Sequence, residues 1–123
     1  MVRIAEIVWL PGPEDHDYPA ALSYLSLIYE VAVAEQYVAA LRAASMSSFK
    51  AKDIFRASGL SLLGVSNSHV QVVRRKIKRA AGLSPLLLVR DGAHGKIVVA
   101  DGYHRLCAVY TFAEDMMVPC RIV

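Results

Sequence analysis

The chain has 123 residues, 55% of them hydrophobic, and a net charge of +3, which predicts one domain that buries its own core without disulfides or a structural metal. The two cysteines, Cys107 and Cys120, lie in apolar patterns, which argues against a disulfide framework and favours buried, reduced thiols in a cytoplasmic protein. No signal-peptide pattern follows Met1 and no apolar run approaches a membrane span, so we expect no membrane contact.

The first part of the chain predicts a strand followed by helices. Arg3 to Leu10 is rich in apolar and β-branched residues, which is typical of a strand, and a Pro-Gly-Pro sequence ends it. Asp17 is the candidate N-cap before an alanine- and leucine-rich stretch from Ala20 to Ala44. The apolar spacing there predicts either one long helix or two helices with a break near Glu30 to Ala32.

The middle of the chain predicts a basic amphipathic helix. Phe49 to Ile54 fits either a strand or a turn into a short helix. Ser68 is the candidate N-cap of a helix from His69 to Ala81, and Gly82 is the residue expected to end it. One face of this helix is apolar, and the other is basic, with Arg74, Arg75, Lys76, Lys78 and Arg79.

Charge divides the chain into an acidic and a basic part. Residues 1–48 carry two basic and six acidic side chains, net −4, whereas residues 49–123 carry twelve basic and five acidic ones, net +7. An anionic partner would therefore bind the second part, and the candidate nucleic-acid contacts are Arg74, Arg75, Lys78 and Arg79. A solvated basic face that keeps a small domain soluble explains the same run, and the sequence leaves both readings open.

The C-terminal part predicts a hairpin, a helix and a last strand. Leu86 to Val89 is a continuous apolar run typical of a fully buried strand. A turn with two glycines leads to a second strand, Lys96 to Ala100, so the two strands are expected to pair as a hairpin. A helix from Tyr103 to Phe112 and a strand from Met117 to Val123 complete the chain.

The junction between the second hairpin strand and the following helix concentrates polar chemistry. Gly102 at a strand-to-helix turn brings backbone N–H groups close to a ligand, and His104 and Arg105 follow in the first helical turn. Such a combination favours a phosphate, for which the guanidinium of Arg105 is the strongest candidate. His104 fits either phosphate contact or a core hydrogen bond. Asp101 fits a metal ligand, a base, a helix cap or a partner of Arg105.

The order of these elements, together with Gly102-Tyr103-His104-Arg105-Leu106-Cys107-Ala108, resembles the ParB/sulfiredoxin superfamily over residues 49–123. The resemblance implies an α+β fold in which a small mixed sheet packs with helices. On this interpretation residues 1–123 form a single domain. Residues 49–123 are its ParB/sulfiredoxin-like core, and residues 1–48 add an N-terminal strand and a helical segment.

The same resemblance implies that the glycine turn holds the phosphates of a nucleotide, with ATP or CTP and Mg²⁺ as the expected ligands. The phosphate-binding candidates carried over or placed nearby are Gly102, His104, Arg105, His69, Lys76 and Lys52. Tyr103 stands where sulfiredoxins need a cysteine, so sulfiredoxin activity is not expected. Asp101 and Asp53 are the candidate catalytic carboxylates, and only Asp101 is a candidate metal ligand.

Three functions follow as hypotheses. The first is a small nucleotide-binding protein, either a kinase or a nucleotide hydrolase. The second is a DNA-associated ParB-like module, of the partition or nuclease-like kind, that binds through residues 69–81. The third is a non-catalytic scaffold whose acidic N-terminal helices bind a partner or a second copy of the chain, and the apolar richness of the sequence favours a homodimer. The sequence leaves open whether the protein is an enzyme.

Overall fold

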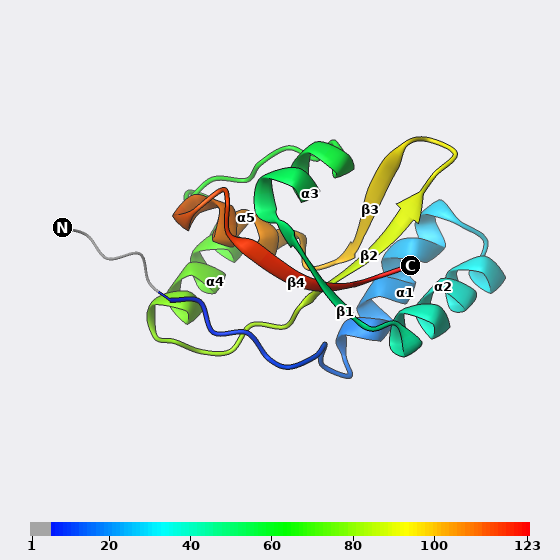
Figure 1. Ribbon diagram of the computed structural model, residues 1–123, viewed down its shortest axis with the longest axis horizontal. Helices are drawn as coiled ribbons and strands as arrows, with labels where there is room; N and C mark the ends of the chain where they lie inside the picture. The colour runs from blue at the N-terminus through cyan, green and yellow to red at the C-terminus, as the bar shows by residue number, and fades with distance from the viewer. Residues whose placement is uncertain (1–5) are drawn as a thin grey trace.

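The computed structural model describes residues 6–123, which form an α+β fold with five helices and a four-stranded mixed sheet (Figure 1). None of the helices in this range is long and apolar enough to cross a membrane. The elements in chain order are α1 (Asp17–Ile28), α2 (Val31–Ala43), β1 (Met46–Lys50), α3 (Ala51–Ser58), α4 (Ser68–Lys78), β2 (Leu86–Asp91), β3 (Lys96–Asp101), α5 (Tyr103–Phe112) and β4 (Met117–Ile122).

The sheet lies between two layers of helices. Its strand order is β1-β4-β2-β3, with β2 and β4 parallel and the other two pairs antiparallel. Helices α1 and α2 pack on one face, and α3, α4 and α5 pack on the other. The glycine turn at the end of β3 therefore lies at an edge strand, where both helical layers reach it.

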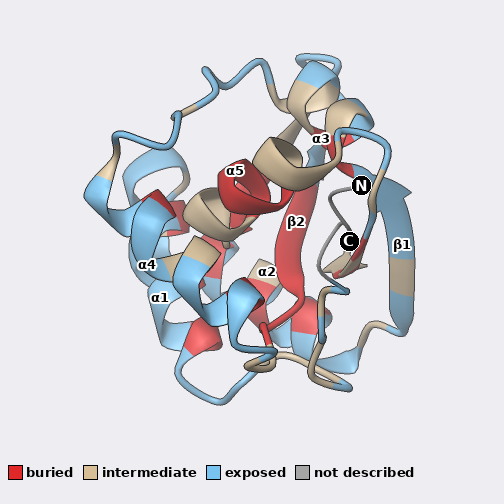
Figure 2. Cartoon of the chain, turned by 90° about the vertical axis from the view of Figure 1, so that its left-hand side faces the viewer, coloured by how far each residue is buried: buried red, intermediate tan, exposed pale blue. Residues whose placement is uncertain are grey.

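Side chains of strand β2 belong to both hydrophobic cores, one on each face of the sheet, as its continuous apolar sequence predicts. Leu86 and Leu88 face the α3, α4 and α5 layer, whereas Leu87 and Val89 face α1 and α2. All four side chains are at most 1% exposed, and Figure 2 shows this strand as buried behind α5. A strand that is covered on both faces has no side exposed to solvent, which explains why apolar and polar residues do not alternate along its sequence.

Several sequence predictions are confirmed by the elements. The alanine-rich stretch is two helices with a break at Tyr29 and Glu30. The stretch from Phe49 to Ile54 combines both expected forms, because β1 ends at Lys50 and α3 begins at the next residue. The hairpin of β2 and β3, the helix α5 and the last strand form where expected, and both cysteines are free and buried.

The predicted N-terminal strand is wrong within the described residues. Residues 6–10 make only one bridge, in which Trp9 pairs with Leu83, and the rest of the prediction lies outside the described range. Leu83 precedes β2 and is not part of the sheet, so this segment has no strand to extend along. The apolar content of the segment instead packs Ile7 and Trp9 against the larger core.

Three predicted helix ends are also wrong. Asn67, not Ser68, is the N-cap of α4, and its side chain accepts hydrogen bonds from the His69 and Val70 amides. The helix ends at Lys78 rather than at residue 81, because Ala80 adopts φ 58° and breaks the helical path. At α1 the N-cap position is His16. Asp17 lies inside the helix, where its carboxylate accepts the Glu14 amide at 2.9 Å.

Candidate functional site

The turn between β3 and α5 requires a glycine at position 102 for steric reasons. Its φ of 107° lies in the region that side chains rarely adopt, and a Cβ there would lie 2.7 Å from Cγ of Leu86. Gly102 is also the N-cap of α5, so no capping side chain covers the first helical turn. The first hydrogen bond of the helix runs from the Leu106 amide to the Gly102 carbonyl at 2.9 Å. The preceding three amides have no intrahelical acceptor.

A hollow of about 240 Å³ lies over this helix start. It is lined by Asp101, Gly102, Tyr103, His104 and Arg105 from the turn, and by His69, Val72 and Val73 from α4. Orphan amides, the positive end of the helix dipole and nearby cationic or polar side chains favour an anion in such a place. The sequence predictions for Gly102, His104, Arg105 and His69 therefore converge on one site.

Two histidines from different helices meet at the hollow. The rings of His69 and His104 are tilted to each other with their centroids 4.8 Å apart. Partial burial lowers the pKa of His104, and the charges of His69 and Arg105 lower it further. An imidazole ring carries at least one N–H in either protonation state, so both rings can donate a hydrogen bond to an anion.

Arg105 is tied to the end of β3. Its Nη2 donates to Oδ2 of Asp101 at 2.8 Å and lies 3.4 Å from the carbonyl of Pro85. The guanidinium is therefore held in place rather than free in solvent. Its Nε is buried, and no atom of residues 6–123 accepts a hydrogen bond from it. A phosphate oxygen near the first turn of α5 is a suitable acceptor for an arginine positioned in this way.

Asp101 lies beside a second carboxyl, that of Asp17, which the sequence did not predict. Burial raises the pKa of the Asp101 carboxyl, the Asp17 carboxyl raises it further, and Arg105 opposes this rise. Asp17 is only 2% exposed although it begins a helix. Asp101 thus pairs with Arg105, which is one of the roles left open by the sequence, and α1 contributes a second carboxyl beside it.

A second hollow, of about 440 Å³, adjoins the first. The two share Asp101, Gly102, Tyr103 and His104, and the second extends along Val99 and Ala100 of the edge strand to Ala20, Tyr24 and Leu60. Tyr24 comes from α1, and Leu60 comes from the loop after α3. Tyr103 anchors that loop, because its hydroxyl donates to the Ser61 carbonyl. Helix α1 therefore forms a wall of the candidate site, which no spacing in the sequence indicated.

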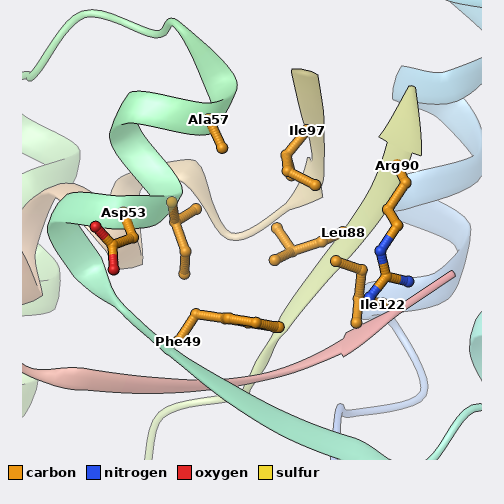
Figure 3. Close-up of a pocket in the computed structure, with 8 residues that line it drawn as sticks. Phe49, Asp53, Ala57, Leu88, Arg90, Ile97 and Ile122 are labelled. Carbon is orange, nitrogen blue, oxygen red and sulfur yellow. The ribbon is translucent and has the colours of Figure 1, made fainter. Parts of the chain in front are cut away.

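Three candidate residues lie away from the glycine turn. Lys52 pairs with Asp115 at 2.7 Å and lines a separate hollow with Phe55 and Tyr110. Asp53 lies beside Arg56, 3.6 Å from its guanidinium, at the rim of the apolar hollow drawn in Figure 3. Lys76 is exposed on α4 and does not line the hollow at His69.

The basic face of α4 divides into packed and exposed residues. Arg74 stacks its guanidinium 4.3 Å from the centre of the Phe112 ring and donates to the Thr111 hydroxyl, so it joins α4 to α5. Arg75 and Lys78 are exposed and line a shallow hollow with Gln71. Arg79 is the C-cap of the helix. Only part of the predicted nucleic-acid surface is therefore free for a partner.

Carboxylates at the turn do not form a multidentate metal site. Within residues 6–123, no three His, Cys, Asp or Glu side chains are grouped in a way that could hold a metal ion. Mg²⁺ usually takes only one or two protein carboxylates and keeps water and phosphate oxygens as its other ligands. Asp101 fits such a limited role only if its contact with Arg105 rearranges.

The chain was also compared with protein-family models, with curated proteins and with solved structures, and none of them matches.

Proposed function

We propose that this protein binds a phosphorylated small molecule, most simply a nucleotide, with its phosphate over the glycine turn. The observation that carries the proposal is the meeting of the open α5 N-terminus with His69, His104 and Arg105 around one hollow. These groups supply backbone amides, imidazole N–H groups and a guanidinium, which are the usual protein ligands of phosphate.

The neighbouring hollow supports an organic ligand rather than a bare ion. A phosphate at the helix start would leave its ester substituent near Tyr24, Leu60 and the edge of β3. This space has room and apolar walls for a sugar or a planar ring. ATP or CTP fits that description, and any Mg²⁺ would arrive largely coordinated by phosphates and water.

The proposal includes membership of the ParB/sulfiredoxin superfamily. It is supported by the order α4, β2, β3, α5, β4 and by the glycine turn at the start of α5. Tyr103 at the position of the sulfiredoxin cysteine argues against sulfinic-acid chemistry, since a phenol is no thiol nucleophile. Whether bound nucleotide is then a kinase substrate or is hydrolysed is a separate step, for which Asp101 is the carboxylate nearest the turn.

A titration with matched histidine variants tests the proposal. Calorimetry with ATP, CTP and pyrophosphate, with and without Mg²⁺, should detect binding to the wild type. His69→Ala should weaken it about tenfold, because one hydrogen bond to a charged group is lost. His94→Ala is the control, since His94 is an exposed hairpin residue that contacts Asp91. No binding by the wild type, or equal binding by all three proteins, contradicts the proposal.

A DNA-associated module is the second candidate, and the exposed side chains of Arg75 and Lys78 favour it. Binding through these residues should weaken steeply with salt, because each phosphate contact releases counterions. The charge-neutralising double variant Arg75→Gln/Lys78→Gln should reduce the salt slope by about two if both residues contact phosphates. DNA binding that changes neither with salt concentration nor with the two substitutions would contradict this candidate.

A further inference from the structure

An apolar hollow under α3 is independent of the glycine turn. Its volume is about 220 Å³, and none of its lining residues lines either hollow at the turn. Helix α3 forms its roof, and every strand of the sheet contributes at least one side chain, as Figure 3 shows with Phe49, Leu88, Ile97 and Ile122.

The walls of this hollow are hydrocarbon. Leu88 and Ile54 are 1% and 3% exposed, whereas Phe49 is 38% exposed. Ile97 and Ile122 are half-buried between these extremes. Small-molecule sites have this character, with mostly apolar walls and a few polar groups that fix orientation. A hollow of about 220 Å³ suits a small ligand.

Arg90 is the cation at one end of the hollow. It continues the row of Leu86 and Leu88 on the same face of β2, where the preceding side chains are fully buried. Within residues 6–123 its guanidinium takes part in none of the ion pairs, which use Lys52, Arg56, Arg105 and histidines. Figure 3 shows the guanidinium beside Ile122, at the rim of the apolar space.

Asp53 is the acidic group at the other end. Its carboxylate lies 3.6 Å from the guanidinium of Arg56, and in Figure 3 it points away from the hollow. Among the described residues that line the hollow, Arg90 is the one cation, so a ligand carboxylate would be attracted to the Arg90 end and would find no cation at the Asp53 end. The two charges therefore favour a single orientation of an anionic ligand.

We propose that the hollow binds a small amphipathic monocarboxylate, with its alkyl or aryl body against Leu88, Ile97 and Ile122 and its carboxylate on Arg90. An arginine outside any ion pair can bind a carboxylate through two parallel hydrogen bonds. A neutral ligand would lack this charge-assisted contact, and a bare phosphate would lack the contact with the apolar walls. The site would operate independently of whatever binds at Gly102.

A chain-length series in solution tests the proposal. Amide resonances of Leu88, Ile97 and Ile122 are followed by NMR during titration with butanoate, hexanoate, octanoate and 1-hexanol. Affinity should rise about fourfold for each added methylene until the hollow is full. Hexanoate should bind at least about tenfold more tightly than 1-hexanol, because only hexanoate forms charge-assisted hydrogen bonds.

Two arginine variants separate the carboxylate contact from general charge. Arg90→Gln should bind hexanoate no better than 1-hexanol, while its binding of 1-hexanol stays unchanged. Arg56→Gln is the control for general charge, because Arg56 lies on α3, the helix over the hollow, but lines a different hollow. It should keep the preference for hexanoate.

Three outcomes overturn the proposal. The first is no saturable shift at the hollow with any acid, and the second is an undiminished preference for hexanoate in Arg90→Gln. The third is movement of the same resonances on simple dilution, which would make a second copy of the chain the occupant. None of these outcomes depends on the glycine turn, so failure here is distinguishable from failure of phosphate binding.

Discussion

Gly102 fixes the position of the candidate site at the scale of one residue. A methyl group at this position would meet Leu86 at 2.7 Å and the Arg105 guanidinium at 3.0 Å, and φ is 107°. The turn therefore places the start of α5 where no other residue could place it without strain. The same close approach explains why Arg105 lies against the turn.

Gly102→Ala is expected to lower the free energy of unfolding by about 1–3 kcal/mol, because the backbone conformation and the contact with Leu86 both become unfavourable. Chemical denaturation measures this loss. Gly64→Ala is the matched control, since a Cβ at Gly64 meets nothing within 4 Å and φ there is not positive. Equal stability changes in the two variants would contradict the steric account of the turn.

The ionisation of Asp101 gives a second prediction at this scale. Burial and the Asp17 carboxyl raise the pKa of Asp101 above its ordinary value of 3.8, despite Arg105. At pH values between the ordinary pKa and the raised pKa of Asp101, this carboxyl is protonated more often in the folded protein than in the unfolded chain. The stabilisation that comes from protonation of Asp101 is complete below its ordinary pKa and is lost as pH rises through its raised pKa.

Asp101→Asn removes this titration, so the wild type should lose stability relative to the variant as pH rises from about 3 to 7. Asp115→Asn provides a control of opposite sign, because the hydrogen bond and charge of Lys52 lower the pKa of Asp115. Urea unfolding across this range measures both differences. A flat difference curve for Asp101→Asn would show that its pKa is not raised in the folded protein.

At the scale of elements, α4 has two kinds of basic residue. Arg74 lies on the Phe112 ring and donates to Thr111, so it holds α4 against α5 and thereby holds His69 over the hollow. Arg75, the next residue, is exposed. The predicted basic face is therefore partly a packing surface.

Arg74→Ala should cost about 1–2 kcal/mol of stability through the lost cation–π and hydrogen-bond contacts. Arg75→Ala, its exposed neighbour, should change stability by less than about 0.5 kcal/mol. Thermal unfolding of both variants checks the contrast. Similar melting temperatures would indicate that the contact between α4 and α5 contributes nothing at Arg74.

Element types were predictable from sequence where local pattern and tertiary packing agree. The continuous apolar run of β2 and the glycine before α5 are such cases. Helix ends were less predictable, because Asn67 and Ser68 are both good caps and only the fold selects Asn67. The sequence predicts that Gly82 ends α4, but the helix ends at Lys78. A Cβ at position 82 would lie 2.7 Å from the Leu10 side chain, so the close approach of another segment explains the glycine.

The candidate site was predictable only in its local part. Gly102, His104 and Arg105 are contiguous, and their chemistry is visible in the sequence. Tyr24 and Asp17 join them because α1 packs against β3, a contact between segments far apart in the chain. Periodicity shows that α1 has an apolar face but does not show which strand this face covers.

At the scale of the whole molecule, one sheet carries two cores. Leu25 of α1 is fully buried with Leu87 and Val89 on one side, while Leu106 is buried on the other. Arg121 of β4 adds a polar connection, donating to the Tyr18 hydroxyl at 3.0 Å and to the Arg42 carbonyl at 2.6 Å. The N-terminal helices should therefore unfold together with the rest of the chain.

Leu25→Ala should lower the free energy of unfolding by about 2–5 kcal/mol, because a large buried side chain leaves a cavity. Leu27→Ala on the same helix should change it by less than about 0.5 kcal/mol, since Leu27 is 87% exposed. Fluorescence of the single tryptophan, Trp9, and far-ultraviolet circular dichroism should report one coincident transition in each protein. Two separate transitions would contradict joint unfolding of the two helical layers.

Phosphate binding at the glycine turn is tested most directly by the amide resonances of Tyr103, His104 and Arg105 during titration with pyrophosphate. These three N–H groups precede the first hydrogen bond of α5, so a bound phosphate should shift them strongly and saturably. The account predicts that they shift together with His69, while Arg75 and Lys78 move little. Shifts confined to Arg75 and Lys78, or no saturable shift at all, would contradict it.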